Sequence, residues 1–102
     1  MDLRVVDVPE QARYEARTAD GELAGFAAYQ LAPQVVVMTH TEVDHAFEGQ
    51  GVATTLIRSA LDDVRSRGLH VVPLCPFVAA FLQRHPDYAD LVFTPPPTRA
   101  TD

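Results

Sequence analysis

The segment Phe47–Ala53 constrains the fold of this chain more than any other stretch of the sequence. It reads Phe-Glu-Gly-Gln-Gly-Val-Ala and places Gly49 and Gly51 between a predicted strand and a strongly amphipathic helix. Glycine lets a ligand come close to the backbone, and the unpaired amides of a first helical turn attract an anion. The pattern therefore predicts a phosphate-binding loop, with a pyrophosphate as the natural ligand. A simple tight turn is the alternative interpretation of the two glycines.

Composition limits the classes of partner and the cellular compartment that fit this chain. The chain has 102 residues, which is enough for one domain, and a formal net charge of -6 from 14 acidic and eight basic residues. Such a balance argues against nucleic acid and anionic membranes and makes cationic partners easier to accept. The start of the chain lacks the apolar core of a signal peptide, and its single cysteine fits the cytosol, so a cytoplasmic location is predicted. The run Leu23–Thr41 contains no Asp, Glu, Lys or Arg, but Gln30, Pro33 and Gln34 interrupt it. Its β-branched second half fits two strands joined by a turn better than one continuous membrane helix.

The first half of the sequence is typical of an antiparallel meander. Strands are expected over 3–8, 12–18, 23–31 and 34–43. The second and third of these form a hairpin around Ala19-Asp20-Gly21, and Pro33 bounds the fourth.

The second half changes to helical periodicity. From Ala53, apolar residues recur at helical spacing, and Gly68 ends the helix. A short strand follows over 70–74. Its connection to the strand at 34–43 is a strand-loop-helix-strand crossover, so those two strands should run parallel.

A second helix is predicted directly after this strand. Cys75 would be its N-cap, Pro76 its first residue, and Pro86 its end. Its expected apolar stripe comprises Phe77, Val78, Phe81 and Leu82, which are predicted to be core residues rather than a cofactor-binding stripe. The domain would then span residues 1–93, and residues 94–102 would form a proline-rich flexible tail.

This order of elements resembles the GNAT acyltransferases, and in particular their minimal single-domain branch. The resemblance is carried by His40-Thr41-Glu42-Val43, by Val72-Pro73-Leu74-Cys75-Pro76-Phe77-Val78 and by Pro86-Asp87-Tyr88, and it covers roughly residues 3 to 92. It implies an α/β (α+β) fold with a mostly antiparallel sheet, a splayed parallel strand pair and two main helices. It also implies an acetyl-coenzyme-A-dependent N-acetyltransferase.

The resemblance assigns the coenzyme site as well. The family's pyrophosphate loop falls on Glu48, Gly49, Gln50, Gly51, Val52 and Ala53, with Thr54 just inside the helix. The family usually has Arg or Gln where this chain has Glu48, and a carboxylate pointing inward would repel phosphates. The strand backbone around Thr41 and Val43 would bind the pantetheine arm as an added strand.

Two residues of the same strand are candidate bases. Alternation places His40 and Glu42 on one face of the strand, where either could accept a proton from an attacking amine. The alternative is that both are surface residues or a local hydrogen-bonded pair.

Cys75 and Tyr88 are the candidate acids. A thiol at a helix N-terminus is more readily ionised, so Cys75 could act as a nucleophile or protonate the departing coenzyme thiolate. The alternative for Cys75 is a small buried hydrophobe. Tyr88 is the substitute acid, because many GNAT enzymes give this role to a tyrosine.

No metal site is expected. His40, Glu42, His45 and Cys75 are all possible zinc ligands, but they lack the paired spacing of structural sites, and a zinc deaminase would need a second cysteine. The predicted function is acetyl transfer to an unidentified amine, possibly cationic or protein-borne, because an open acceptor side suits a bulky acceptor. A non-catalytic acyl-coenzyme-A-binding or sensing module is the alternative, and a protein-interaction domain is the third hypothesis.

Overall fold

The computed structural model describes residues 2–95, and its central element is a five-stranded mixed sheet. Its strands are β1 (Leu3–Val8), β2 (Arg13–Thr18), β3 (Leu23–Ala32), β4 (Val35–Val43) and β5 (His70–Pro73), in this spatial order. The first four pair antiparallel, and β4 and β5 pair parallel. The predicted α+β class, meander and parallel pair are thus confirmed. Most of the proposed tail, residues 96–102, lies outside the described residues.

Two helices follow the meander, α1 (Val52–Ser66) and α2 (Pro76–Arg84), and short 3₁₀ turns occur at Pro9–Gln11, His45–Phe47 and Pro86–Leu91. The buried side chains of α1 have helical spacing: Val52, Leu56, Ile57, Ala60, Leu61 and Val64. Gly68 adopts a left-handed φ of 68° just beyond this helix, as its predicted role at the helix end requires.

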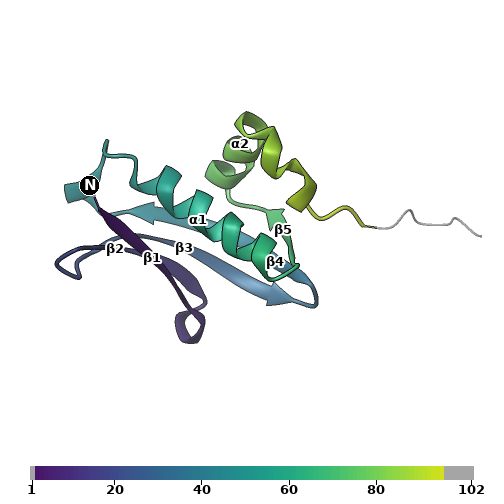
Figure 1. Ribbon diagram of the computed structural model, residues 1–102, viewed down its shortest axis with the longest axis horizontal. Helices are drawn as coiled ribbons and strands as arrows, with labels where there is room; N and C mark the ends of the chain where they lie inside the picture. Colours follow the sequence, from purple (N-terminus) through teal and green to yellow (C-terminus); the bar gives the residue numbers. More distant parts are fainter. Residues whose placement is uncertain (1, 96–102) are drawn as a thin grey trace, which may run out of the picture.

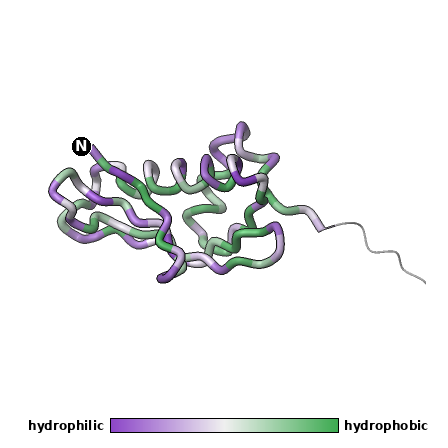
Figure 2. Tube along the Cα trace, turned by 60° about the horizontal axis from the view of Figure 1, so that its bottom comes forward, coloured by the Kyte–Doolittle hydropathy of each residue, from purple (hydrophilic) through white to green (hydrophobic). Residues whose placement is uncertain are grey.

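Both helices cover the same face of the sheet (Figure 1). α1 contacts all five strands, whereas α2 contacts β4 and β5. Hydrophobic residues occur along both the strands and the helices (Figure 2), and the buried ones form a single core cluster between the sheet and the helices. Within residues 2–95, no helix packs on the opposite face, which is called the open face below.

A β-bulge in β4 decides which side chains reach the open face. Ala28 pairs with His40 while its neighbour Tyr29 pairs with Met38, so Thr39 is an extra residue on β4. Met38 is fully buried beneath the helices. In an unbroken strand His40 would share this buried side, but the extra residue turns His40 and Glu42 outward.

β4 and β5 separate after only four paired residues. Their ladder runs from Val35–His70 to Met38–Pro73, and the Cys75 amide then donates to the Met38 carbonyl at 2.9 Å. The chain next turns into α2, while β4 continues to Val43. Among the described residues no strand pairs with 39–43 on this side, which confirms the predicted splayed pair.

A tyrosine–carboxylate network ties the meander to the end of α1. The Tyr14 hydroxyl donates to Asp63 at 2.7 Å, and the Tyr29 hydroxyl donates to Asp7. Arg67 joins the two carboxylates, with distances of 2.9 Å to Asp7 and 3.0 Å to Asp63. Burial, followed by the hydrogen bond to a carboxylate, raises the pKa of both tyrosines.

Candidate functional site

The predicted phosphate loop lies at the carboxyl end of β4 and leads directly into α1. Gly49 and Gly51 have φ of 78° and 76°, a conformation that residues with side chains rarely adopt. Gly51 is the N-cap of α1 and brings no capping side chain, and the first turn of the helix contains no acidic residue. Among the described residues, the first-turn amides therefore have no intrahelical or capping partner. A hollow of about 300 Å³ lies over them, lined by Val43, Phe47, Glu48, Gly49, Gly51, Val52, Ala53 and Thr54.

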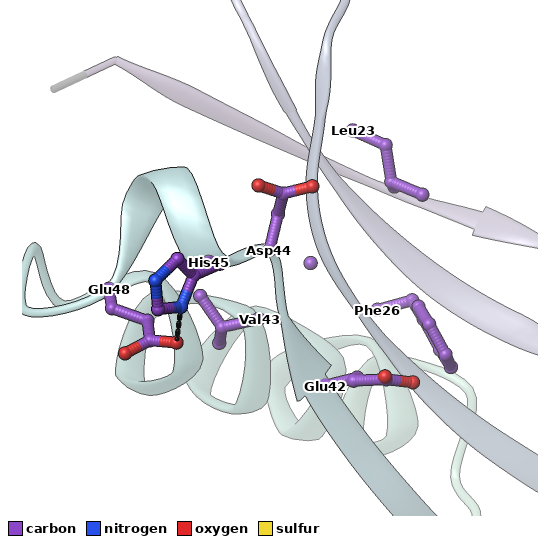
Figure 3. Close-up of a pocket in the computed structure, with 8 residues that line it drawn as sticks. Leu23, Phe26, Glu42, Val43, Asp44, His45 and Glu48 are labelled. Carbon is purple, nitrogen blue, oxygen red and sulfur yellow. Dashed lines mark hydrogen bonds and ion pairs between the residues drawn. The ribbon is translucent and has the colours of Figure 1, made fainter.

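Glu48, the residue that departs from the family pattern, is held to one side by His45. The two side chains form a hydrogen bond of 2.8 Å between Nδ1 and Oε1 (Figure 3). When His45 is protonated, this contact becomes an ion pair and offsets the carboxylate charge beside the loop.

Thr41 and Cys75 meet where β4 and β5 separate. The Cys75 sulfur lies 3.4 Å from the Thr41 hydroxyl, and the thiol is only 3% exposed. Cys75 is the N-cap of α2, as predicted, and its carbonyl accepts a hydrogen bond from the Ala79 amide. The thiol therefore lies at the helix N-terminus, on the side of the sheet that the helices cover.

His40 and Glu42 lie on the open face, where their side chains approach to 3.4 Å and are 61% and 62% exposed. The Phe26 ring of β3 meets the His40 ring edge-on, with centroids 6.2 Å apart. A hollow of about 370 Å³ begins beside them, lined by Leu23, Gly25, Phe26, Glu42, Val43, Asp44, His45 and Glu48 (Figure 3). The structure thus brings His40 to Glu42 and Thr41 to Cys75, in two separate pairs.

Tyr88 forms neither of these pairs. Its hydroxyl donates to Asp62 of α1 at 2.6 Å, and its ring packs near Phe81 and Arg58. Burial, reinforced by the hydrogen bond to Asp62, raises the pKa of Tyr88. The hydroxyl would have to leave Asp62 before it could donate to a substrate.

Sequence reasoning missed a third hollow, between α1 and α2. It measures about 300 Å³ and is lined by Thr54, Phe77, Ala80, Phe81, Arg84 and His85. The prediction of Phe77 as a core residue is wrong, because it is 39% exposed while Val78, Phe81 and Leu82 are buried. Helical spacing gave the available signal, since Phe77, Phe81 and Arg84 stand three or four residues apart.

Comparison with known proteins identifies the family. A family model described as GCN5-related N-acetyl-transferase matches residues 13–91. The chain belongs to this family. This match confirms the predicted resemblance to the GNAT family.

Individual relatives agree with the family match. Protein NATD1 of Bos taurus is 34% identical over 56 residues, which cover 55% of this chain and 50% of that protein. The match therefore spans half the length of this relative. A GCN5-like N-acetyltransferase candidate from Staphylococcus aureus shares the fold, with a TM-score of 0.68, 18% identity, and coverage of 89% of this chain and 88% of its own. A ribosomal-protein-alanine N-acetyltransferase from Brucella melitensis gives a TM-score of 0.52 at 23% identity, with coverage of 88% and 68%.

Two further observations concern residues 2–95 of this family member. No group of three or more His, Cys, Asp or Glu side chains is arranged there to hold a metal ion. No helix in this part of the chain has the length and apolar character needed to cross a membrane. The cytoplasmic location stays a prediction.

Proposed function

We propose that the chain transfers an acetyl group from acetyl-coenzyme A to an amine acceptor. The observation that carries the proposal is the glycine loop, because within residues 2–95 neither its first-turn amides nor the adjacent edge of β4 has a hydrogen-bond partner. The pyrophosphate would lie on the amides of Val52, Ala53 and Thr54. The pantetheine arm would run along the backbone of Thr41 and Val43 as an added strand.

The nucleotide end of the coenzyme would reach the hollow between the helices. Thr54 lines both this hollow and the one over the loop, so the two spaces share a wall. Arg84 offers a cation there and Phe77 an exposed ring. These residues suit a phosphate and a base, respectively.

The two residue pairs suit the two proton transfers of the reaction, from the amine and to the coenzyme thiolate. The amine nitrogen would attack the thioester carbonyl, forming the C–N bond and breaking the C–S bond. His40, with Glu42 beside it, would accept the proton that the amine loses. The Cys75 thiol would give its proton to the departing coenzyme thiolate, and Tyr88 is the alternative acid. In this assignment the base would act from the open face and the acid from the covered face.

The open face is the route for the acceptor, because α1 and α2 cover the other side. Three carboxylates, those of Glu42, Asp44 and Glu48, line the hollow beside His40. Such a lining favours a cationic acceptor. An uncovered sheet also leaves room for a protein-borne amine, although the acceptor itself is unidentified.

Two experiments test the proposal. Calorimetry and thermal melting with coenzyme A should show binding and a raised midpoint, because a ligand of the folded state stabilises it. Assays with peptide and polyamine panels should show acetylated product. Binding without thioester loss across all amines would favour a non-catalytic acyl-coenzyme-A module, and no binding would refute the proposed site.

Variants then assign the roles. His40→Gln and Glu42→Gln should lower kcat by roughly 10²-fold or more if either is the base. Cys75→Ala and Tyr88→Phe separate the two acids. If activity survives both of these substitutions, neither residue protonates the thiolate.

A further inference from the structure

Three arginines gather on the open face at the end of the sheet away from β4. Arg13 and Arg17 of β2 both bind the carboxylate of Glu15, with shortest distances of 2.7 Å and 2.8 Å. Arg4 of β1 stands directly opposite Arg17 in the register. Arg4 forms no ion pair within residues 2–95.

This arrangement leaves uncompensated positive charge. Glu15 is only 4% exposed and can neutralise one of its two arginines. Like charges directly opposite each other across two strands are destabilising. Arg4 and Arg17 therefore form a cationic end of the face, in a chain whose formal net charge is -6.

The other end of the same face is acidic. Glu42 lies on β4, and Asp44 and Glu48 follow it around the hollow (Figure 3). Phe26 lies between the two ends, because it pairs with Glu15 on one side and Glu42 on the other. The Arg13 guanidinium covers its ring at 4.5 Å from the centroid. A ligand that crosses this face therefore contacts carboxylates at one end, the Phe26 ring in the middle and arginines at the other end.

We propose that the open face binds an extended acceptor polypeptide whose reactive amine lies at His40 and Glu42 and whose acidic residues reach Arg4 and Arg17. The inference rests on the proposed acetyl transfer and adds a substrate class to it. Charge complementarity selects this occupant, because the amine is cationic and the following segment is anionic. The two ends lie three strands apart and are also offset along the strands, so they are separated by on the order of 15 to 20 Å. An extended chain spans this distance with about five residues.

The test uses three peptides of equal length with the same first residue. One carries two glutamates at positions five and six, the second carries them at positions two and three, and the third carries glutamines only. We expect the first peptide to exceed the other two in kcat/KM by roughly fivefold, since two exposed charge contacts contribute about 1 kcal/mol together. The advantage should disappear at high salt.

Arg4→Glu is the matched variant, because Arg4 is exposed and the new carboxylate would pair with Arg17. The ratio of kcat/KM between peptides within one variant cancels any difference in the amount of active enzyme. This ratio should fall to about one in Arg4→Glu, while Arg65→Gln, on α1, should keep it.

The outcomes are distinct. Equal kcat/KM for the first two peptides would overturn the inference, because they have the same net charge. A concentration-dependent dimer in light scattering that Arg4→Glu abolishes would also overturn it, and would assign the face to a second copy of the chain. Acetylation of small amines without any discrimination among peptides would refute the inference but keep the proposed function. Failure to acetylate any amine would refute the proposed function itself.

Discussion

Replacing Gly51 with alanine should distinguish an effect on the proposed coenzyme site from an effect on the stability of the fold. Gly51 has φ of 76°, and within residues 2–95 a Cβ at this position would have no atom within 4 Å other than those of Gly51 and its two chain neighbours. The cost is therefore backbone strain rather than a clash, about 1–2 kcal/mol for a side-chain-bearing residue in this conformation. In a domain of this size, each 1 kcal/mol lowers Tm by roughly 4–8 °C.

The effect on binding should be larger than the effect on stability. If the loop relaxes to relieve the strain, the first-turn amides rotate away from the pyrophosphate. Each charge-assisted hydrogen bond lost contributes roughly 1.5–3 kcal/mol. We therefore expect Kd for coenzyme A, measured by isothermal titration calorimetry, to rise roughly ten- to a hundredfold.

Gly21→Ala is the matched control. Gly21 has φ of 87°, also faces open space, and lies between β2 and β3. It should lower Tm by a similar amount and leave Kd unchanged. If Gly51→Ala binds coenzyme A as tightly as Gly21→Ala does, the loop amides do not hold the pyrophosphate.

Three further perturbations test the framework around the site. Gly25→Ala should lower the urea midpoint by an amount equivalent to about 1–3 kcal/mol, because its Cβ would lie 2.7 Å from the Glu42 carbonyl; an unchanged midpoint would show that β3 shifts freely. Hydrogen bonds from Arg17 lower the pKa of Glu15, so its stabilisation is present above the ordinary carboxyl pKa of about 4.3 and is lost as pH falls through the depressed value. Urea unfolding of Glu15→Gln should accordingly show less loss of stability below about pH 4 than the parent protein. The raised pKa of Tyr14 gives stability that is present below about pH 10 and is lost as pH rises further, so Tyr14→Phe should flatten the alkaline limb in circular-dichroism melts, and an unaltered limb would contradict this.

The sequence predicted those elements whose signals are local. The periodic apolar residues gave α1 to within one residue of its start at Val52, and Gly68 gave its end. The hairpin around Asp20 and the proline at the start of α2 were equally direct. In each case the deciding residues lie within a few positions of the element that they specify.

Features that depend on distant pairing were not predictable. The bulge at Thr39 exists because Ala28 and Tyr29 pair with residues on either side of it, and nothing in the local sequence marks it. The hydrogen bond from Tyr88 to Asp62 joins residues 26 positions apart, so its effect on a candidate acid had no sequence signal.

The cationic end of the open face was predictable only in part. Arg13, Glu15 and Arg17 alternate along one strand, and this spacing places all three side chains on one side. That much was available from the sequence. Their position opposite Arg4, and on the same face as Glu42, required the register of four strands.

The separation of β4 from β5 has a consequence for the handling of the protein. Residues 39–43 present backbone donors and acceptors along an edge that no neighbouring strand of residues 2–95 occupies. Such an edge is a template for strand addition by another chain, and concentrated protein without a ligand is exposed to that reaction. A coenzyme bound along this edge would block strand addition, so coenzyme binding would reduce aggregation as well as support turnover.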